Sequence, residues 1–292
     1  MLLASRVNQA IAIMRRHGTM SCPMYDKPTS KLKSWEQELI TYQEEHMRKR
    51  VVAIIEARMT SERLPGKVML PLGGKPALEH VINRCFDARL VDQVVVASPV
   101  GSDSDPIKDL CKRTWTTFHQ GSEHDVLSRV ADAASEWKAD IIVSVTGDCP
   151  LTDTATIDYM LEAAIAANDV LGAECNQFFT NMCQESEPWP LGFAVQIFNR
   201  DMLKRADHVA HEQKYREHSG LWMSENCERV EFRCPIEAQD LPRLTLDYEE
   251  DYQLLQKVFE KEPQDLLDLN YIFSCHPEWR EINAHCVQKV PV

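Results

Sequence analysis

The segment from Val51 to Lys67 joins an apolar run to a basic loop, and it constrains the fold more than any other stretch of the chain. Its first five residues, Val51 to Ile55, are apolar and mostly β-branched, which is typical of a buried strand. The loop after this run carries three cations: Arg58, Arg63 and Lys67. The whole protein has a formal net charge of -13. Positive charge is therefore concentrated where a strand ends, and a polyanion such as a triphosphate could be gripped there.

This loop does not follow the Walker A pattern of P-loop nucleotide-binding proteins. Gly66-Lys67 is followed by Val68 rather than by Ser or Thr, and no earlier glycine opens the pattern. The sequence therefore predicts a phosphate-binding loop of another kind.

Apolar runs alternate with helical segments after the basic loop. Further runs at 93–97 and 141–145 predict buried strands, a helix is expected to open near Pro76, and the pattern predicts another helix over 122–139. Ser122 and Asp125 are spaced as a capping box for that helix. This order predicts an α/β, Rossmann-like, mainly parallel sheet with helices on both faces. Ligands then belong at the carboxyl ends of the strands.

Two aspartates occupy such strand ends. Asp148 follows the run at 141–145 and Gly147, and Asp247 follows Leu244-Thr245-Leu246, which we expect to be another strand. Two carboxylates from distant chain positions suit a hard Mg²⁺ ion that also holds phosphate oxygens and water. Asp247 also precedes an acidic helix start, so we expect it to serve as both a metal ligand and a helix N-cap.

Composition narrows the class of protein and its compartment. Asp and Glu number 45 against 32 Lys and Arg, which disfavours binding to nucleic acid or to an anionic membrane. No run approaches the roughly 18 to 20 apolar residues of a membrane-spanning helix. Ten cysteines occur without a C-x-x-C pair, so we expect reduced thiols in a cytoplasmic protein.

Several motifs, in one order along the chain, resemble those of the cytidylyltransferases that make CMP-activated sugar acids. The similarity is greatest to the branch of spore coat polysaccharide biosynthesis protein F, and it covers roughly residues 50 to 260. The matching stretches are Ala57 to Pro76, Gly121 to Leu127, Gly147 to Leu151, Glu217-His218 and Arg243 to Tyr252. The resemblance implies a fold of the nucleotide-diphospho-sugar transferase type.

The resemblance also implies roles for individual residues. It assigns the phosphates of CTP to the basic loop: Ala57, Arg58, Ser61, Arg63 and Lys67. It brings the cytidine close to Gly121 and Ser122, although Ser122 could equally be an ordinary helix cap. It gives Mg²⁺ to Asp148 and Asp247, and catalysis to these two together with Arg58 and Lys67.

On the acceptor side, the resemblance points to Glu217 and His218, and Arg243 could pair with an acceptor carboxylate. One departure concerns Gly192 to Gln196, where the resembling family tends to read Gly-Leu-Asp-Val-Glu. Two acidic groups are therefore missing beside Gln196, which favours a more anionic or less hydroxylated acceptor. The nearby histidines His208 and His211 are interpreted as surface residues or hydrogen-bonded core residues rather than metal ligands.

Three segments follow from these patterns. Residues 1–48 are expected to form an accessory helical arm, although residues 1–25, which contain Arg6, Arg15 and Arg16 and no acid, also have the composition of an organellar presequence. Residues 49–292 are expected to form the nucleotidyltransferase domain. Within it, the irregular stretch 168–239 is expected to be a small inserted subdomain for acceptor binding and dimerisation.

The sequence therefore predicts a cytoplasmic, homodimeric, Mg²⁺-dependent enzyme that joins CMP from CTP to a small acidic acceptor and releases pyrophosphate. The acceptor is expected to be a sugar acid or another small carboxylate or phosphonate. Two alternatives stay open: the use of another nucleoside triphosphate, and a non-catalytic nucleotide-binding subunit of an assembly.

Overall fold

A computed structural model describes residues 49–182, 189–235 and 240–287; the N-terminal arm expected for 1–48 lies outside them. The strands are β1 (Val51–Glu56), β2 (Pro71–Leu72), β3 (Lys75–Pro76), β4 (Gln93–Pro99), β5 (Thr117–Gly121), β6 (Ile141–Thr146), β7 (Gln177–Thr180), β8 (Gln196–Asn199) and β9 (Glu228–Glu231). The α-helices are α3 (Ala77–Asp87), α4 (Asp105–Arg113), α5 (Val126–Glu136), α6 (Thr154–Leu171), α7 (Arg200–Val209), α8 (Gln213–Glu217), α9 (Leu221–Asn226), α10 (Glu249–Phe259) and α11 (Leu266–Cys275). Short 3₁₀ turns are η2 (Lys67–Met69), η3 (Ser102–Ser104), η4 (Gly172–Glu174) and η6 (Pro277–Glu281).

The sheet has the strand order β5-β4-β1-β6-β8-β7-β9 in the described part of the chain. Strands β5, β4, β1 and β6 run parallel, as predicted, whereas β8 pairs antiparallel with both β6 and β7. Because β1 lies between β4 and β6, the loops that leave these three strands meet at one edge of the sheet. The basic loop and Asp148 therefore emerge side by side.

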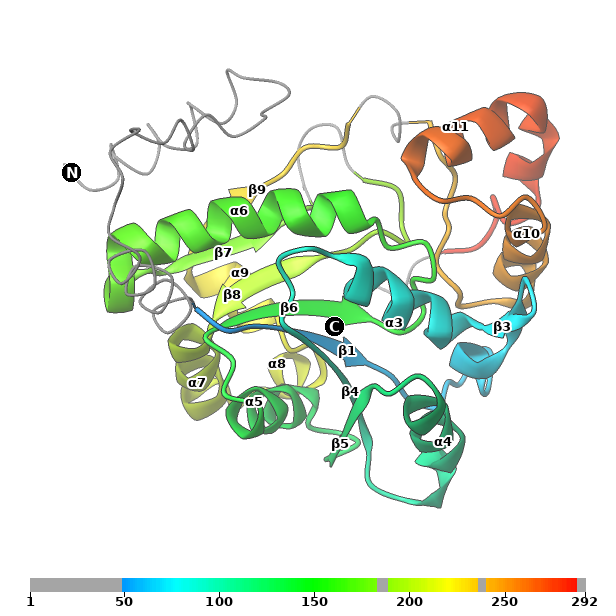
Figure 1. The fold of residues 1–292 in the computed structure, drawn as a ribbon. Coiled ribbons are helices and arrows are strands. Elements are labelled where there is room, and N and C mark those ends of the chain that lie inside the picture. The colour runs from blue at the N-terminus through cyan, green and yellow to red at the C-terminus, as the bar shows by residue number, and fades with distance from the viewer. Residues whose placement is uncertain (1–48, 183–188, 236–239, 288–292) are drawn as a thin grey trace, which may run out of the picture.

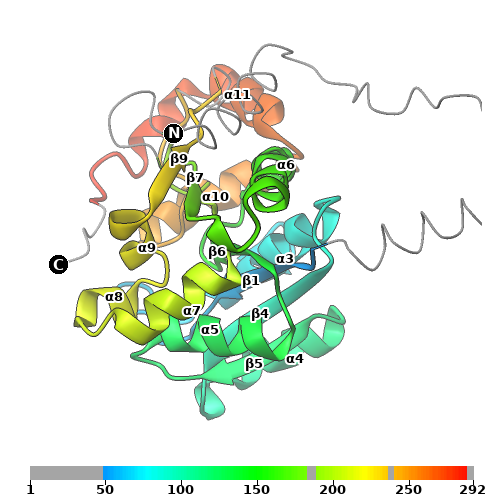
Figure 2. The ribbon, with the colours of Figure 1, turned by 90° about the vertical axis from the view of Figure 1, so that its left-hand side faces the viewer.

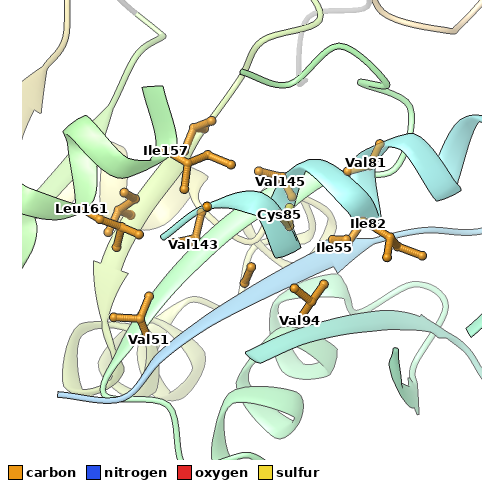
Figure 3. Packing of buried hydrophobic residues seen from close by; sticks show 14 of the residues in the cluster. Val51, Ile55, Val81, Ile82, Cys85, Val94, Val143, Val145, Ile157 and Leu161 are labelled. Carbon is orange, nitrogen blue, oxygen red and sulfur yellow. The ribbon is translucent and has the colours of Figure 1, made fainter. Parts of the chain in front are cut away.

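Helices cover both faces of this sheet (Figure 1 and Figure 2). Alternate residues of β1 separate the two layers: Val51, Ala53 and Ile55 pack with α3, α4 and α6, whereas Val52 and Ile54 pack with α5, α7 and α9. Figure 3 shows the first layer, with Val81 and Cys85 of α3 and Ile157 and Leu161 of α6 over the sheet. Burial on both faces explains the continuous apolar run of β1.

The last two α-helices form a third apolar cluster beyond the end of β1 (Figure 1). Leu254, Leu255 and Val258 of α10 and Phe273 of α11 pack there with Leu244 and Leu246. This packing places the start of α10 beside the carboxyl edge of the sheet. Among the described residues, no helix has the length and apolar character needed to span a membrane.

The stretch 168–239 extends the main sheet through β7, β8 and β9 rather than forming a layer of its own. Its expected roles in acceptor binding and dimerisation stay predictions. The helix predicted over 122–139 is shorter, because Asp125 is the N-cap of α5 and accepts a hydrogen bond from the Ser128 N–H (2.9 Å). Ser122 Oγ accepts from the Asp125 N–H (3.1 Å) and shapes the turn before the helix.

Candidate active site

Lys67 joins the two predicted metal ligands at the carboxyl edge of the sheet. Its Nζ lies 2.5 Å from Asp148 Oδ2 and 2.6 Å from Asp247 Oδ1. Burial would lower the pKa of Lys67, but the charges of Asp148 and Asp247 outweigh it and raise that pKa. The structure thus brings Lys67, Asp148 and Asp247 together, and Lys67 is held as an ammonium ion between the two carboxylates.

Backbone contacts explain how these distant residues meet. Gly66 adopts a left-handed conformation (φ 70°), and its N–H donates to the Met59 carbonyl (2.9 Å), which closes the basic loop just before Lys67. The Leu246 N–H donates to the Asp148 carbonyl (2.8 Å). The Thr245 hydroxyl donates to the same carbonyl (3.3 Å), and the two bonds place Asp247 next to Asp148.

The strand expected over Leu244-Thr245-Leu246 is wrong. Leu244 N–H bonds to the Leu191 carbonyl (2.6 Å), whereas Leu246 bonds to Asp148, so the segment contacts two different partners and forms no ladder. The N-cap role predicted for Asp247 is also wrong, because Tyr248 is the N-cap of α10. Asp247 is instead turned toward the cations.

Asp247 contacts three cations, although its side chain is only 6% exposed. Besides Lys67, Arg63 Nη2 lies 3.0 Å from Oδ1 and Arg243 Nη2 lies 2.7 Å from Oδ2. Burial would raise the pKa of Asp247, but Lys67 and then Arg63 outweigh it and lower the pKa to about 2. Arg63 and Arg243 also lie over the ring of Tyr248, at 5.0 and 5.7 Å from its centroid.

Asp251 supports the segment that carries Asp247, a contact that the sequence did not predict. It is fully buried, and its Oδ2 accepts hydrogen bonds from the backbone N–H groups of Asp247 and Tyr248 (both 3.0 Å). Its Oδ1 lies 3.0 Å from Arg243 Nε and accepts from Asn283 Nδ2 (2.7 Å). Arg243 is thus bonded to both Asp247 and Asp251, and its predicted pairing with an acceptor carboxylate stays a prediction.

The other residues of the basic loop differ in their exposure and in their hydrogen bonds. Arg58 is exposed, whereas Ala57 is buried and donates its N–H to the Ala97 carbonyl (3.1 Å). Ser61 Oγ accepts from the Leu64 N–H (3.4 Å), so it helps to shape the loop. Within this loop, Arg63 and Lys67 are therefore tied into the acidic network, and Arg58 extends toward solvent.

A cavity of about 140 Å³ lies next to the Arg58 end of the loop. It is lined by Met59, Thr60, Glu123 and the stretch from Pro99 to Ser104, which leaves the carboxyl end of β4. Thr60 Oγ1 donates to Glu123 Oε1 (2.7 Å) across its rim.

Gly121 and Ser122, the predicted cytidine contacts, immediately precede Glu123 of this cavity. A Cβ on Gly121 would lie 2.8 Å from Arg129 Cγ, so the buried Arg129 requires glycine there. The guanidinium of Arg129 donates to the Ser122 carbonyl. The side chain of Arg129 therefore fixes the backbone turn at Gly121 and Ser122, beside the cavity.

Three further residues were predicted on the acceptor side: Gln196 is the first residue of β8, Glu217 is the last residue of α8, and His218 follows it as the C-cap. Glu217 and His218 are exposed, and the two residues after them, Ser219 and Gly220, are buried. His208 and His211 are exposed, as interpreted from the sequence, and they belong to no group of three metal donors in the described chain. Cys149 beside Asp148 is a packing residue, because burial raises the pKa of its thiol to about 12.

Asp148 and Asp247 have the donor chemistry that Mg²⁺ requires, namely carboxylate oxygens converging on one point. The point of convergence is now held by the Lys67 ammonium, so these oxygens fit a cation once Lys67 turns toward a bound anion. Asp148 is the more accessible ligand, with 22% of its side chain exposed against 6% for Asp247.

An open-edged α/β sheet, a basic loop after its first strand and paired carboxylates beside it define a nucleotidyltransferase. The chain belongs to the cytidylyltransferase family, whose sequence model matches residues 52–270. This result confirms the family and the fold that the motifs predicted.

Individual relatives agree with this assignment. The chain is 29% identical over 220 residues to the spore coat polysaccharide biosynthesis protein SpsF of Bacillus subtilis, covering 72% of this chain and 87% of the relative. It is 39% identical over 119 residues to a 3-deoxy-manno-octulosonate cytidylyltransferase of Geobacter sulfurreducens, covering 40% of this chain and 46% of that one. The structure of a cytidylyltransferase from Leptospira borgpetersenii matches with a TM-score of 0.73 and 28% identity, over 83% of this chain and 99% of that chain.

Proposed function

We propose that the protein transfers CMP from CTP to a small acidic acceptor and releases pyrophosphate. The observation that carries the proposal is Lys67, which lies between two carboxylates at the strand edge and borders a loop with two further arginines. Family membership supports the use of CTP, and the 3-deoxysugar acid in the name of one relative supports an acidic acceptor.

In this proposal the triphosphate lies along the basic loop. Lys67 leaves the carboxylates for the phosphates, and Arg58 and Arg63 stabilise the charge that develops on the departing pyrophosphate. Asp148 and Asp247 would hold Mg²⁺, which would supply Lewis-acid stabilisation of phosphate charge. Asp251 and Arg243 position Asp247 from behind.

The cavity beside Met59 and Thr60 accommodates the nucleoside in this arrangement. Gly121 and Ser122 precede Glu123 of the cavity lining in the chain, and the firmly fixed turn there suits recognition of a base by close approach. The acceptor approaches from the side of Gln196, Glu217 and His218.

We also propose that the enzyme works in the cytoplasm, where its thiols stay reduced. All eight cysteines of the described residues are free. The homodimer expected from the sequence stays a prediction, which light scattering of the purified protein would check.

The direct test of the function is a pyrophosphate-release assay with four nucleoside triphosphates and a panel of acidic acceptors, including 3-deoxy-manno-octulosonate. We expect turnover with CTP, with Mg²⁺, and only when an acceptor is present. Turnover with another nucleotide would favour the first alternative. Tight CTP binding without turnover on any acceptor would favour a non-catalytic subunit.

A further inference from the structure

Glu56 is the last residue of β1 and immediately precedes the nucleotide loop. Its Oε1 accepts hydrogen bonds from two hydroxyls, Ser144 Oγ (3.1 Å) and Ser219 Oγ (2.5 Å). Ser144 lies in the neighbouring strand β6, within the rigid sheet. Ser219 lies in the turn between α8 and α9, far along the chain. One carboxylate oxygen thus connects the sheet edge to a distant turn.

The next residue of that turn makes a second close contact with the sheet. A Cβ on Gly220 would lie 1.8 Å from Gln196 Oε1, so the turn packs directly against the Gln196 side chain. Gln196 is also the register partner of Ser144 in the β6–β8 pair. Ser219 and Gly220 therefore dock on adjacent positions of the sheet, at Glu56 and at Gln196.

The same segment is fixed at its other end by Arg216. Its guanidinium bonds to both oxygens of Asp125 (2.9 and 2.7 Å), the N-cap of α5, and to Asp207 of α7 (2.7 Å). Between this anchor and Ser219 lie only Glu217 and His218, both exposed. Their position is consequently set by two polar anchors, one of which is Glu56.

Glu56 is suited to this role by its surroundings. Burial raises the pKa of its carboxyl, while the Ser219 hydroxyl, the charge of Arg129 and the Ser144 hydroxyl oppose that effect. Hydrogen bonds to an ionised acceptor are shorter and stronger than those between neutral groups. A carboxylate at this point therefore holds the turn more firmly than a neutral acceptor would.

We propose that Glu56 is a positioning residue that fixes the Glu217-His218 pair relative to the nucleotide loop, through Ser219. It thereby aligns the acceptor with the phosphates, because the loop starts at the residue after Glu56. The acceptor part of this inference rests on the proposed function, whereas the anchoring of the turn does not.

The test compares Glu56→Ala, Glu56→Gln and Ser219→Ala with the control Ser144→Ala, which removes the other hydroxyl bonded to Glu56 but leaves the turn untouched. Hydrogen–deuterium exchange of residues 213–226 needs no acceptor. We expect exchange there to rise by about tenfold in Ser219→Ala and Glu56→Ala, the effect of losing a hydrogen bond to a charged group. Exchange in the double variant Glu56→Ala/Ser219→Ala should rise no more than in either single variant. Exchange in Ser144→Ala should resemble that of the wild type.

Kinetics with CTP and 3-deoxy-manno-octulosonate supply the second arm. The acceptor KM should rise by about tenfold in Ser219→Ala, while the Kd of CTP measured by calorimetry stays within about twofold. Glu56→Gln should restore both properties only in part, because its amide oxygen can still accept from both hydroxyls but carries no charge.

Equal effects of Ser144→Ala and Ser219→Ala, or unchanged exchange in Ser219→Ala, would overturn the proposal, as would an equal weakening of CTP and acceptor binding. If Glu56→Ala does not fold, Ser219→Ala decides alone. Absence of turnover by the wild type would count against the proposed function only, since the exchange experiment still decides the anchoring.

Discussion

The two ends of the basic loop differ in how their cations are held. At the far end, Lys67 and Arg63 are bonded to Asp247, and Lys67 also to Asp148. At the near end, Arg58 is exposed beside a cavity of about 140 Å³. The far end of the loop therefore holds its positive charge in ion pairs. At the near end, the positive charge of Arg58 is exposed to solvent, where a ligand can contact it.

The largest expected effect distinguishes the two carboxylates. Asp148→Ala and Asp247→Ala should both abolish turnover, because each is a proposed Mg²⁺ ligand. Only Asp247→Ala should also lower the free energy of unfolding, by about 1–3 kcal/mol, since Lys67, Arg63 and Arg243 each lose one carboxylate partner in a mostly buried network. Asp148 is more exposed, so its loss should cost about 1 kcal/mol or less.

The sequence predicted the same metal role for both aspartates, and the expected difference in stability comes from their unequal burial. Urea denaturation beside the pyrophosphate assay measures both quantities, and Asp109→Ala, a change at an exposed ion pair of α4, is the matched control. Equal free energies of unfolding for Asp148→Ala and Asp247→Ala would contradict the expected difference between the two carboxylates.

The next effect contrasts two cations of the same loop. Lys67→Ala and Arg58→Ala should each weaken transition-state stabilisation by about 2–4 kcal/mol, or roughly 30- to 1000-fold in kcat/KM. Melting temperature should stay unchanged in Arg58→Ala. It should fall only slightly in Lys67→Ala, because Asp247 keeps Arg63 and Arg243.

Lys75→Ala, at an exposed lysine of β3, controls for the loss of a positive charge. If Lys67→Ala and Arg58→Ala unfold the protein while the remaining folded enzyme keeps full specific activity, the loop is structural and the contrast fails.

A smaller effect concerns acid stability of the Mg²⁺-free protein. The pKa of Asp247 is lowered from 3.8 to about 2, so its carboxylate stabilises the fold above its unfolded pKa. That contribution, about 2 kcal/mol, should be lost as the pH falls from near 4 through 2. The free energy of unfolding should change less with pH over this range in Asp247→Asn than in the wild type. An equal pH dependence of the two proteins would show that Asp247 is not the origin of the acid destabilisation.

The smallest expected effect belongs to the cavity at the near end. Thr60→Ala removes the hydroxyl that bonds to Glu123 across the rim, an exposed pair, and we expect the KM for CTP to rise by roughly threefold or less. Melting temperature should not change. A loss as large as that of Lys67→Ala would mean that the rim, rather than the charged end, dominates nucleotide binding.

The sequence predicted the elements whose causes are local. The β-branched run of β1, the apolar runs of β4 and β6 and the buried face of α5 are each visible in neighbouring residues, and the basic loop and Asp148 follow directly from their place after a strand. Lys67 and Asp247 were assigned through a resemblance that covered both motifs.

The sequence could not show contacts that depend on distant packing. Tyr248 is an unusual N-cap, so the helix start and the role of Asp251 were hidden. The sequence did not show that Arg243 pairs with Asp247 and Asp251, because these contacts form only when the turn before α10 has folded. Likewise, nothing near Glu56 indicates Ser219, which reaches it only after α8 and α9 have packed.

The most direct test of the central claim is pyrophosphate release by the wild type and by Asp148→Ala, with each of four nucleoside triphosphates, Mg²⁺ and an acidic acceptor panel. We predict release by the wild type with CTP that depends on an acceptor, and none above background by the folded Asp148→Ala variant. Release that is independent of the acceptor, that prefers another nucleotide, or that persists in Asp148→Ala would contradict the assignment of this site.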